Sequence, residues 1–244
     1  MDSTRTAIVT GGSRGIGRAT ALRLGRDGYA VVVGYAGNRA LAEEVVAEVE
    51  AAGGHALAAG GDLADPAVAQ HLFDVAEEAF GGADLLVHAA GQMVLAPVAE
   101  LDLDDLDRTF QVNVRSTFAL AQQGVRRLRS GGSMVLFSTS VVGLAFPTYG
   151  AYVASKGAVE ALTPILAKEL RGRDVTVNTV APGPTATDLF LDGKTDEQVQ
   201  QLAQQPPLQR LGQPEDIARV VAFLAGPEGH WVNGQTLRAN GGLV

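Results

Sequence analysis

The sequence predicts a single α/β domain, with a doubly wound parallel sheet of about seven strands and helices on both faces. Short apolar runs rich in Val and Ile alternate along the chain with longer amphipathic segments, as in a parallel sheet that is covered on both faces. Glycines cluster at the ends of these runs, where the ligand-binding turns of such sheets lie. No internal repeat, linker or change of composition divides the 244 residues, so we expect one domain over residues 1–244.

The expected strands are the short runs in which aliphatic and β-branched residues dominate. Right-handed crossovers between parallel strands then leave few topologies besides the doubly wound one. In chain order, the expected strands are Ala7–Val9, Ala30–Val33, His55–Ala59, Leu85–His88, Ser133–Phe137, Val175–Val180 and Gln235–Arg238.

The expected helices are the longer segments with apolar residues at steps of three and four. The longest such pattern begins at Leu103 and ends at Arg129, and we expect one continuous helix there. Pro164 lies inside another expected helix, where its missing N–H and its clash with a preceding carbonyl predict a bend. In chain order, the expected helices are Gly15–Asp27, Ala40–Ala52, Pro66–Phe80, Leu103–Arg129, Ala151–Arg171 and Pro214–Ala225.

The composition argues against several classes of protein. The chain has no Cys, and its four His are scattered, so we expect no disulfide and no metal site. A net charge of −8 argues against nucleic-acid and anionic-membrane surfaces, which need basic patches. No stretch reaches the ~18 apolar residues of a membrane span, and Met1 to Thr6 lack the pattern of a signal peptide. We therefore expect a cytoplasmic protein that binds neither nucleic acid nor membrane.

A glycine-rich turn follows the first expected strand and opens the first expected helix. Its glycines are spaced GxxxGxG. One glycine allows a tight turn, another lets the backbone approach a diphosphate, and the third lets helix and strand pack closely. The helix N-terminus adds free N–H groups and a partial positive charge. We therefore predict a dinucleotide site, whose residues here are Gly11, Ser13, Arg14, Gly15, Ile16 and Gly17.

The end of the second expected strand indicates which dinucleotide is bound. An NAD-selective site needs a carboxylate there to hold the ribose 2′-hydroxyl, but no acid follows Tyr35 before Glu43. Arg14, together with Arg39 or Asn38, could instead engage a 2′-phosphate. We therefore expect NADP(H) to be the preferred cofactor, with NAD(H) also possible. The alternative interpretation of the two arginines is that both are solvated surface groups.

Tyr152 and Lys156 are four residues apart, on one face of the expected Ala151–Arg171 helix. A phenol has a pKa of roughly 10. We expect the ammonium, together with the positive nicotinamide of an oxidised cofactor, to lower that pKa. Tyr152 can then give a proton to a carbonyl oxygen or take one from an alcohol. Tyr149 is a rival phenol, but it lacks a Lys four residues later.

Three hydroxyl side chains compete for a second role. Ser138, Thr139 and Ser140 stand at the end of an expected strand, shortly before Tyr152. A hydroxyl at this place can donate a hydrogen bond to a substrate carbonyl oxygen. The alternative is that all three cap the end of the strand.

Together these motifs resemble the short-chain dehydrogenase/reductase family, of the kind that includes β-ketoacyl-carrier-protein reductases. The resemblance implies a Rossmann-type fold, reduction of a ketone to a secondary alcohol or the reverse, and a homotetramer or dimer. The matching motifs are Thr10–Gly17, Asp62-Leu63, Ala90-Gly91, Asn113, Ser140, Tyr152 with Lys156, Pro182-Gly183, Arg210–Ala218 and Asn240–Gly242.

The resemblance implies a catalytic tetrad. Asn113 would hold a water that links the lysine to solvent, and Ser140 would orient the substrate. Tyr152 would be the acid and base, while Lys156 would lower its pKa and bind the nicotinamide ribose. The residues implied to bind cofactor, besides the glycine-rich turn, are Tyr35, Asn38, Arg39, Asp62, Leu63, Ala89, Ala90, Gly91, Tyr152, Lys156, Pro182, Gly183, Thr185 and Thr187.

Two departures from the family pattern matter. The family's usual Asn-Asn-Ala-Gly is His88 to Gly91 here, and we expect His88 to be structural rather than a catalytic base. The gap between Ser140 and Tyr152 is one residue shorter than is common, which keeps Ser138 as an alternative.

The substrate wall is expected from 92–94, 142–149 and 188–209, the last being a mobile lid with a helix at Thr195–Gln204. Its apolar side chains favour a ketone with apolar flanks; they are Leu144, Phe146, Tyr149, Leu189 and Phe190. A carrier protein would need a basic patch beside the entrance, for which Arg126, Arg127 and Arg129 are candidates, but we expect these residues to form a solvated helix end. Two further hypotheses are an NAD-dependent dehydrogenase of a sugar or steroid alcohol, and a non-catalytic dinucleotide-binding protein.

Overall fold

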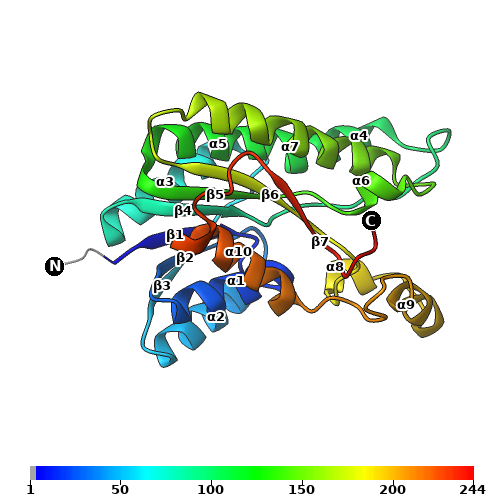
Figure 1. The fold of residues 1–244 in the computed structure, drawn as a ribbon, viewed down its shortest axis with the longest axis horizontal. Helices are drawn as coiled ribbons and strands as arrows, with labels where there is room; N and C mark the ends of the chain where they lie inside the picture. The colour runs from blue at the N-terminus through cyan, green and yellow to red at the C-terminus, as the bar shows by residue number, and fades with distance from the viewer. Residues whose placement is uncertain (1–3) are drawn as a thin grey trace.

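Seven parallel strands form one sheet in the order β3-β2-β1-β4-β5-β6-β7 in the computed structural model, which describes residues 4–244. Helices α3, α5 and α7 cover one face, and α1, α2 and α10 cover the other (Figure 1). The prediction of a doubly wound α/β domain is therefore confirmed. The strands are β1 Thr6–Thr10, β2 Ala30–Tyr35, β3 His55–Gly60, β4 Ala83–His88, β5 Leu128–Phe137, β6 Thr176–Pro182 and β7 Thr236–Ala239.

The helices fill the intervals between the strands. Most agree with the expected segments to within a residue or two. They are α1 Gly15–Arg26, α2 Arg39–Ala51, α3 Pro66–Phe80, α4 Leu103–Phe110, α5 Ser116–Arg127, α6 Val141–Leu144, α7 Gly150–Glu169, α8 Asp188–Leu191, α9 Asp196–Ala203 and α10 Pro214–Ala225, with a π-helix, η1, at Gln111–Arg115 and a 3-10 turn, η2, at Pro227–Gly229.

The core lies on both sides of the sheet. On β1, Ile8 packs in the cluster beneath α3, α5 and α7, whereas Ala7 and Val9 pack in the cluster beneath α1, α2 and α10. Successive side chains of a strand point to opposite faces, so a strand that is buried on both faces reads as a continuous apolar run.

The expected continuous helix from Leu103 to Arg129 is wrong at two places. A π-helical turn at Gln111–Arg115 interrupts it, and the helix ends at Arg127. Leu128 already belongs to β5, which pairs with Ala83 of β4, and Arg129 forms an ion pair with Asp84 on that neighbouring strand. Pairing across the sheet therefore overrides the helical periodicity at this end.

Helix α7 continues through Pro164 to Glu169. Pro164 removes one backbone donor from the helix. Beside the proline, the Thr163 hydroxyl donates a hydrogen bond to the Val159 carbonyl one turn earlier in the helix (2.9 Å). The residue lies two turns beyond Lys156, so any distortion falls away from the Tyr152–Lys156 pair.

The remaining sequence expectations concern membranes, metals and the N-terminus. Within residues 4–244, no helix has the length and hydropathy of a membrane span. The same residues contain no group of three or more His, Asp or Glu placed to hold a metal ion. The expectation that Met1 to Thr6 form no leader falls partly on residues 1–3, which lie outside the described residues.

Candidate functional site

The site lies at the carboxyl ends of the central strands. β1 and β4 are neighbours in the sheet, although β2 and β3 separate them in the chain. Open α/β sheets bind ligands at such a switch in strand order. The turn after β1 meets the turn after β4 so closely that a Cβ on Gly11 would lie 2.9 Å from the Ala90 nitrogen. Only a glycine fits that approach, and Gly11 also has φ of +64°.

A long cleft of about 1070 Å³ opens above this junction. Gly17 packs so tightly under the turn that a Cβ there would lie 2.1 Å from the Gly11 carbonyl oxygen. Arg14, the N-cap of α1, has an extended backbone and makes no side-chain cap, so the first N–H groups of the helix have no intrahelical partner. These unpartnered donors, a positive helix end and the Arg14 guanidinium fit an anionic diphosphate. The residues of the cleft therefore fit a dinucleotide.

Most of the residues predicted to bind cofactor line this cleft. Arg39 does not: its guanidinium pairs with Glu43 on the same helix (2.6 Å) and its side chain is 77% exposed. Asn38 lines the cleft and also caps α2, since its Oδ1 accepts from the Leu41 nitrogen (3.2 Å). The predicted residues found along the cleft are Gly11, Ser13, Arg14, Gly15, Ile16, Gly17, Tyr35, Asn38, Asp62, Leu63, Ala89, Ala90, Gly91 and Thr187.

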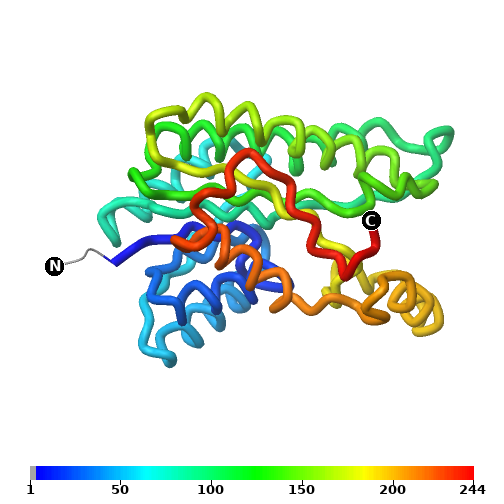
Figure 2. The backbone as a smooth tube through the Cα atoms, in the orientation of Figure 1, coloured from blue at the N-terminus to red at the C-terminus, as the bar shows by residue number. Residues whose placement is uncertain are grey.

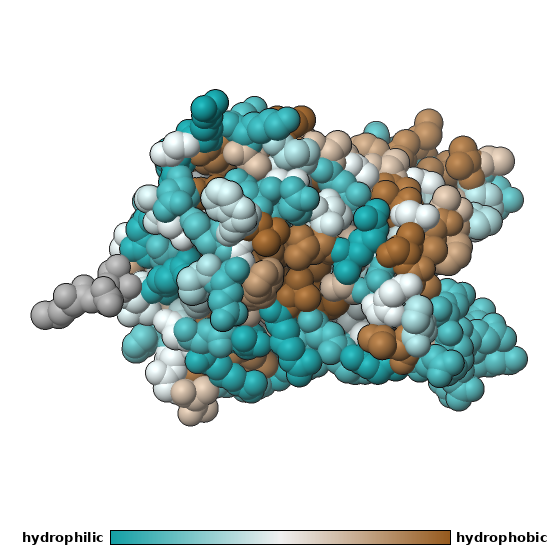
Figure 3. Space-filling view, viewed as in Figure 1, coloured by the Kyte–Doolittle hydropathy of each residue, from teal (hydrophilic) through white to brown (hydrophobic). Residues whose placement is uncertain are grey.

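A second, mostly apolar pocket adjoins the cleft and shares Ile16, Ala89, Gly91, Thr187 and Leu189 with it. Figure 3 shows hydrophobic surface gathered where α6, α8 and the C-terminal tail meet, while the exposed sides of α1 and α2 are largely hydrophilic. The lining residues named by the sequence are Ser138, Thr139, Ser140, Leu144, Phe146, Tyr149, Tyr152, Lys156, Pro182, Gly183, Thr185, Leu189 and Phe190.

The sequence did not indicate that the C-terminal tail belongs to this pocket. Leu243 lines the pocket, and Val244 packs on Gly143 of α6. Figure 2 shows the chain after β7 turning back toward α6 and α8. The motif Asn240–Gly242 indicated the family but not the position of the tail, because the local sequence does not show where a terminal segment folds back.

Tyr152 and Lys156 lie on the same face of α7, as predicted. The Lys156 Nζ is 5.9 Å from the Tyr152 ring centroid and donates to the Phe137 carbonyl (3.0 Å). Burial raises the pKa of Tyr152 to about 12, against the lowering effect of a hydrogen bond from Thr139. Burial lowers the pKa of Lys156 to about 8.

The expected lowering of the Tyr152 pKa by the ammonium is therefore absent from the protein without cofactor. Desolvation of a charged phenolate outweighs the neighbouring groups, and Lys156 is directed to a backbone carbonyl. Tyr152 is thus held as a neutral phenol at neutral pH, the protonation state of a proton donor.

The three competing hydroxyls have different partners. Ser138 donates to Glu160 (2.7 Å). Ser140 donates to the Ala181 carbonyl (3.1 Å) and accepts from the Asn240 amide (3.0 Å). Thr139 accepts from the Val141 nitrogen (3.3 Å).

Asn113 lies in the π-helical turn, a distortion that is frequent at functional sites. Its amide holds the backbone of Gln92 at both ends: Nδ2 donates to the Gln92 carbonyl and Oδ1 accepts from the Gln92 nitrogen, each at 2.8 Å. Nδ2 also donates to Ser155 (3.0 Å). Asn113 and Lys156 flank Gly91, where a Cβ would meet both side chains at 3.3 Å. The π-helical turn thus fixes the loop that follows β4 beside the lysine.

His88 braces the sheet. Its Nδ1 bonds Thr10 (2.8 Å) and its Nε2 bonds Ser116 (3.0 Å). Burial lowers the pKa of His88 to about 3, and the charge of Lys156 acts in the same direction. A histidine that is neutral and bonded on both nitrogens agrees with the expected structural role.

The segment expected to be a lid borders both cavities. Leu189, Phe190 and Leu202 line the apolar pocket, and Leu191 to Gly193 line the cleft. The expected helix at Thr195–Gln204 is α9, and Thr195 and Gln198 close its first turn as a capping box.

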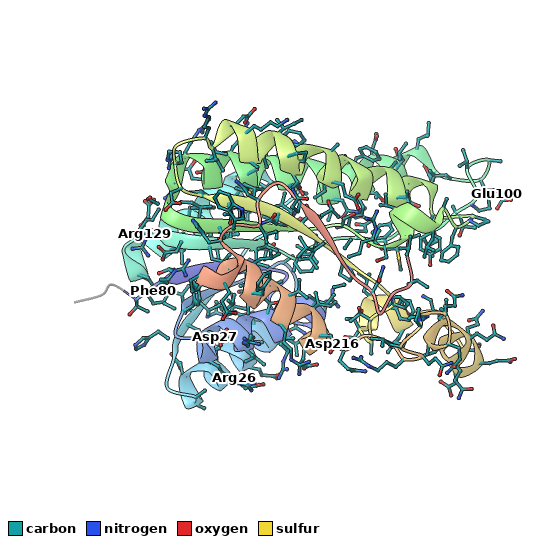
Figure 4. All side chains as sticks on the ribbon, in the orientation of Figure 1. Arg26, Asp27, Phe80, Glu100, Arg129 and Asp216 are labelled. Carbon is teal, nitrogen blue, oxygen red and sulfur yellow. The ribbon has the colours of Figure 1, made fainter. Side chains whose placement is uncertain are left out.

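The arginines considered for carrier-protein docking do not lie beside the entrance. Arg127 is paired with Asp74 and Glu77 of α3, and Arg129 with Asp84. Figure 4 shows Arg129 at the end of the molecule opposite α8 and α9. Arg127 and Arg129 therefore pair with acids away from the entrance and do not form a basic patch beside it.

Known proteins resemble this chain over nearly its whole length. The family described as enoyl-(acyl carrier protein) reductase matches residues 11–244. A short-chain type dehydrogenase/reductase of Picea abies is 44% identical over 98% of this chain and 92% of its own. An NADPH-dependent aldehyde reductase-like protein, chloroplastic, of Arabidopsis thaliana is 41% identical over 98% of this chain and 94% of its own.

A solved structure has the same fold. A short-chain dehydrogenase from Burkholderia cenocepacia, in complex with NADP, superposes with a TM-score of 0.92 at 39% identity, covering 98% of this chain and 97% of that one. The chain belongs to the short-chain dehydrogenase/reductase family.

Proposed function

We propose that this protein reduces a carbonyl compound to an alcohol with NADPH, by hydride transfer coupled to proton donation from Tyr152. The observation that carries the proposal is the position of Tyr152 and Lys156. Both line the apolar pocket, and the Lys156 Nζ adjoins Gly91, which lines both the pocket and the dinucleotide cleft. A substrate oxygen beside Tyr152 would therefore lie next to the end of the cleft that fits a nicotinamide.

When bound, reduced nicotinamide supplies the hydride to the carbonyl carbon. Tyr152, neutral because burial raises its pKa to about 12, donates its proton to the carbonyl oxygen. Lys156 is a buried cation that favours the phenolate left behind, and its pKa of about 8 suits proton uptake near neutral pH. Asn113 fixes the Gly91–Gln92 loop beside the lysine; a water relay through it is part of this proposal.

NADPH is the proposed cofactor because Arg14 and Asn38 line the cleft beyond β2 and no carboxylate stands there. The unpartnered N-terminus of α1 adds favourable charge for phosphate. The names of the Arabidopsis relative and the Burkholderia complex support the same choice. Arg39 contributes less than expected, because Glu43 already holds its guanidinium.

The proposed substrate is a carbonyl compound with apolar or aromatic flanks. Met93, Leu144, Phe146, Leu189 and Leu243 give apolar surface to the pocket that Tyr152 also lines. A sugar would leave many of its hydroxyls unpaired there, at a cost of roughly 1–3 kcal/mol for each buried group. This observation favours an apolar ketone or aldehyde over the sugar alcohol considered from the sequence.

The test is turnover of a small panel: 4-nitrobenzaldehyde, 2-tetralone, a steroid ketone and glucose, each with NADPH and with NADH. We expect loss of NADPH absorbance with the apolar carbonyls. Tyr152→Phe should lower kcat by about 10²–10⁴-fold and leave the Kd for NADPH unchanged. Zero turnover across the panel with tight NADPH binding would support a non-catalytic dinucleotide-binding protein instead.

We further propose that the chain forms a homotetramer or dimer through α5 and α7. Phe118 on α5 is 48% exposed and Ile165 on α7 is 51% exposed. Apolar side chains on the outer faces of adjacent helices are suited to burial against a second copy. Sedimentation velocity tests this assembly.

The cellular location stays a prediction. The sequence is expected to be cytoplasmic, while the Arabidopsis relative is named as chloroplastic. Fractionation of the source cells with an antibody to this chain would decide between a cytoplasmic and an organellar location.

A further inference from the structure

The C-terminal tail, residues 240–244, forms part of the wall of the apolar pocket. The tail follows β7, the edge strand of the sheet, and turns back toward α6 (Figure 2). Leu243 lines the pocket, a cavity of about 160 Å³. The neighbouring Val244 packs on α6, where a Cβ on Gly143 would lie 2.8 Å from the Val244 Cγ2. A segment far along the chain from the Tyr152 motif thus contributes to the site.

The tail also packs against the end of the 188–209 segment. The Leu208 nitrogen donates to the Gly241 carbonyl (3.3 Å). Gly242 has φ of +89°, and a Cβ there would lie 3.1 Å from Pro207, so the chain passes this point only with a glycine. The tail is therefore enclosed between α6 on one side and residues 206–208 on the other.

Asn240 fixes the tail with both ends of its side-chain amide. Its Oδ1 accepts from the Gly242 nitrogen (3.0 Å) and from the Leu243 nitrogen (3.2 Å). Its Nδ2 donates to the main-chain oxygen of Val244 (3.1 Å) and to the Ser140 Oγ (3.0 Å). These bonds use the whole capacity of a carboxamide, which has two donors and two lone pairs on its oxygen.

The same amide connects the tail to a hydroxyl of the proposed reaction site. Ser140, which the family resemblance implies orients the substrate, is 1% exposed and donates to the Ala181 carbonyl of β6 (3.1 Å). Asn240 holds the Ser140 Oγ from the other side. One side chain thus sets the position of Leu243 relative to Ser140. A wall at a fixed distance from the substrate oxygen limits how far a substrate can extend on that side of its carbonyl.

We infer that Leu243 is a specificity-determining residue that limits the size of the carbonyl substrate, and that Asn240 is the positioning residue that holds Leu243 in the pocket wall. This inference rests on the proposed reduction. A fixed apolar side chain excludes any substrate group that overlaps with it, and one methylene in such a pocket changes kcat/KM by about 10–200-fold. Removal of the Leu243 side chain should therefore admit a larger substrate without altering proton donation by Tyr152.

The measurement is the ratio of kcat/KM for 2-tetralone to kcat/KM for 4-nitrobenzaldehyde, both with NADPH. The ketone needs room on both sides of its carbonyl, whereas the aldehyde carries only a hydrogen on one side. Leu243→Ala should raise the ratio by about tenfold or more, and Leu243→Phe should lower it by a similar factor. Leu103→Ala is the matched control, because Leu103 is 68% exposed at the start of α4, and its ratio should equal that of the unaltered protein.

Asn240→Leu nearly keeps the size of the side chain and removes all of its hydrogen bonds. Because the bond to Ser140 is also lost, kcat should fall for both substrates, and the ratio cancels this common loss. The ratio should rise as in Leu243→Ala, and the double variant should raise it no further, since both changes act on the same wall. Asn240→Asp keeps the oxygen that accepts from Gly242 and Leu243, so its ratio should stay close to that of the unaltered protein.

Two results would overturn the inference. Leu243→Ala and Leu243→Phe could leave the ratio where Leu103→Ala leaves it, in which case Leu243 does not limit substrate size. Alternatively, Asn240→Leu could lower turnover without moving the ratio, or its effect on the ratio could add to that of Leu243→Ala. Asn240 would then not act through the tail.

Failure of the proposed function looks different, because the unaltered protein would then reduce neither compound. The position of the tail is in that case measured without turnover. The chain has a single tryptophan, Trp231, which is 99% exposed, so Leu243→Trp in a Trp231→Phe background places the one indole at the pocket wall. Its emission should be blue-shifted and weakly quenched by acrylamide, and Asn240→Leu should reverse both. An indole that is fully quenched with Asn240 in place would refute the position of the tail.

Discussion

Replacing Lys156 by Met should stabilise the fold while abolishing efficient turnover. Burial lowers the pKa of Lys156 from 10.5 to about 8. A difference of about 2.5 pH units corresponds to roughly 3 kcal/mol of destabilisation by the buried charge at neutral pH. Met removes the charge but leaves the Phe137 carbonyl without its 3.0 Å donor, which costs about 1–3 kcal/mol. The net expectation is a free energy of unfolding higher by about 1 kcal/mol near neutral pH.

The pH dependence is the sharper test, and its sign follows from proton binding. Below about pH 8 the ammonium is charged in both states, and the folded protein carries the full cost of burying it. Between about pH 8 and the ordinary lysine value, the unfolded chain binds the proton and the folded chain does not, so stability rises with pH. The unaltered protein should gain about 2 kcal/mol from this group between about pH 7 and about pH 9.5, and Lys156→Met should gain none of it.

The assay is urea unfolding of the protein without cofactor, followed by far-ultraviolet circular dichroism at both pH values. Lys168→Met is the matched control, because Lys168 is exposed on the same helix, and its pH dependence should equal that of the unaltered protein. The reasoning is refuted if Lys156→Met keeps the full pH dependence, or if it is much less stable near neutral pH.

Three further changes test the cleft and the assembly. Asn38→Asp preserves the cap of α2 but places a carboxylate beside the proposed 2′-phosphate, so fluorescence titration should show the Kd for NADPH rising about tenfold or more while that for NADH does not. Gly17→Ala puts a methyl 2.1 Å from the Gly11 carbonyl oxygen. Urea titration should show a free energy of unfolding lower by about 2 kcal/mol or more, and NADPH binding should weaken. Gly157→Ala is the control, because a Cβ there meets open space, and it should keep or raise the stability in the same titration. Ile165→Glu should shift the sedimentation coefficient toward a smaller species, and an unchanged coefficient would contradict assembly through α7.

Local sequence patterns were sufficient for the sheet and for the glycine turn. The strands β1, β2, β4 and β6 are buried on both faces and therefore read as short apolar runs. The edge strands β3 and β7 are partly exposed, but their short runs were also placed from the sequence. The glycines at 11, 15 and 17 lie close to one another in the sequence, and their geometry depends on a single turn. Tyr152 and Lys156 are four residues apart, and their geometry depends on a single helical turn. Residue spacing determines both.

The partners of polar groups could not be predicted in this way, because several acceptors compete for each donor and the competitors come from distant segments. The Ser140 hydroxyl donates a hydrogen bond to the Ala181 carbonyl and accepts one from the side-chain amide of Asn240, which lies 100 positions later in the chain. The direction of the Tyr152 pKa depends on burial beneath helices and a tail that the motif does not contain. Likewise, Leu128 extends β5 because Ala83 pairs with it across the sheet. The periodicity of apolar residues indicates which side chains are buried. Hydrogen-bond partners and the desolvation of charged groups depend instead on which atoms from distant segments lie next to each position in the folded structure.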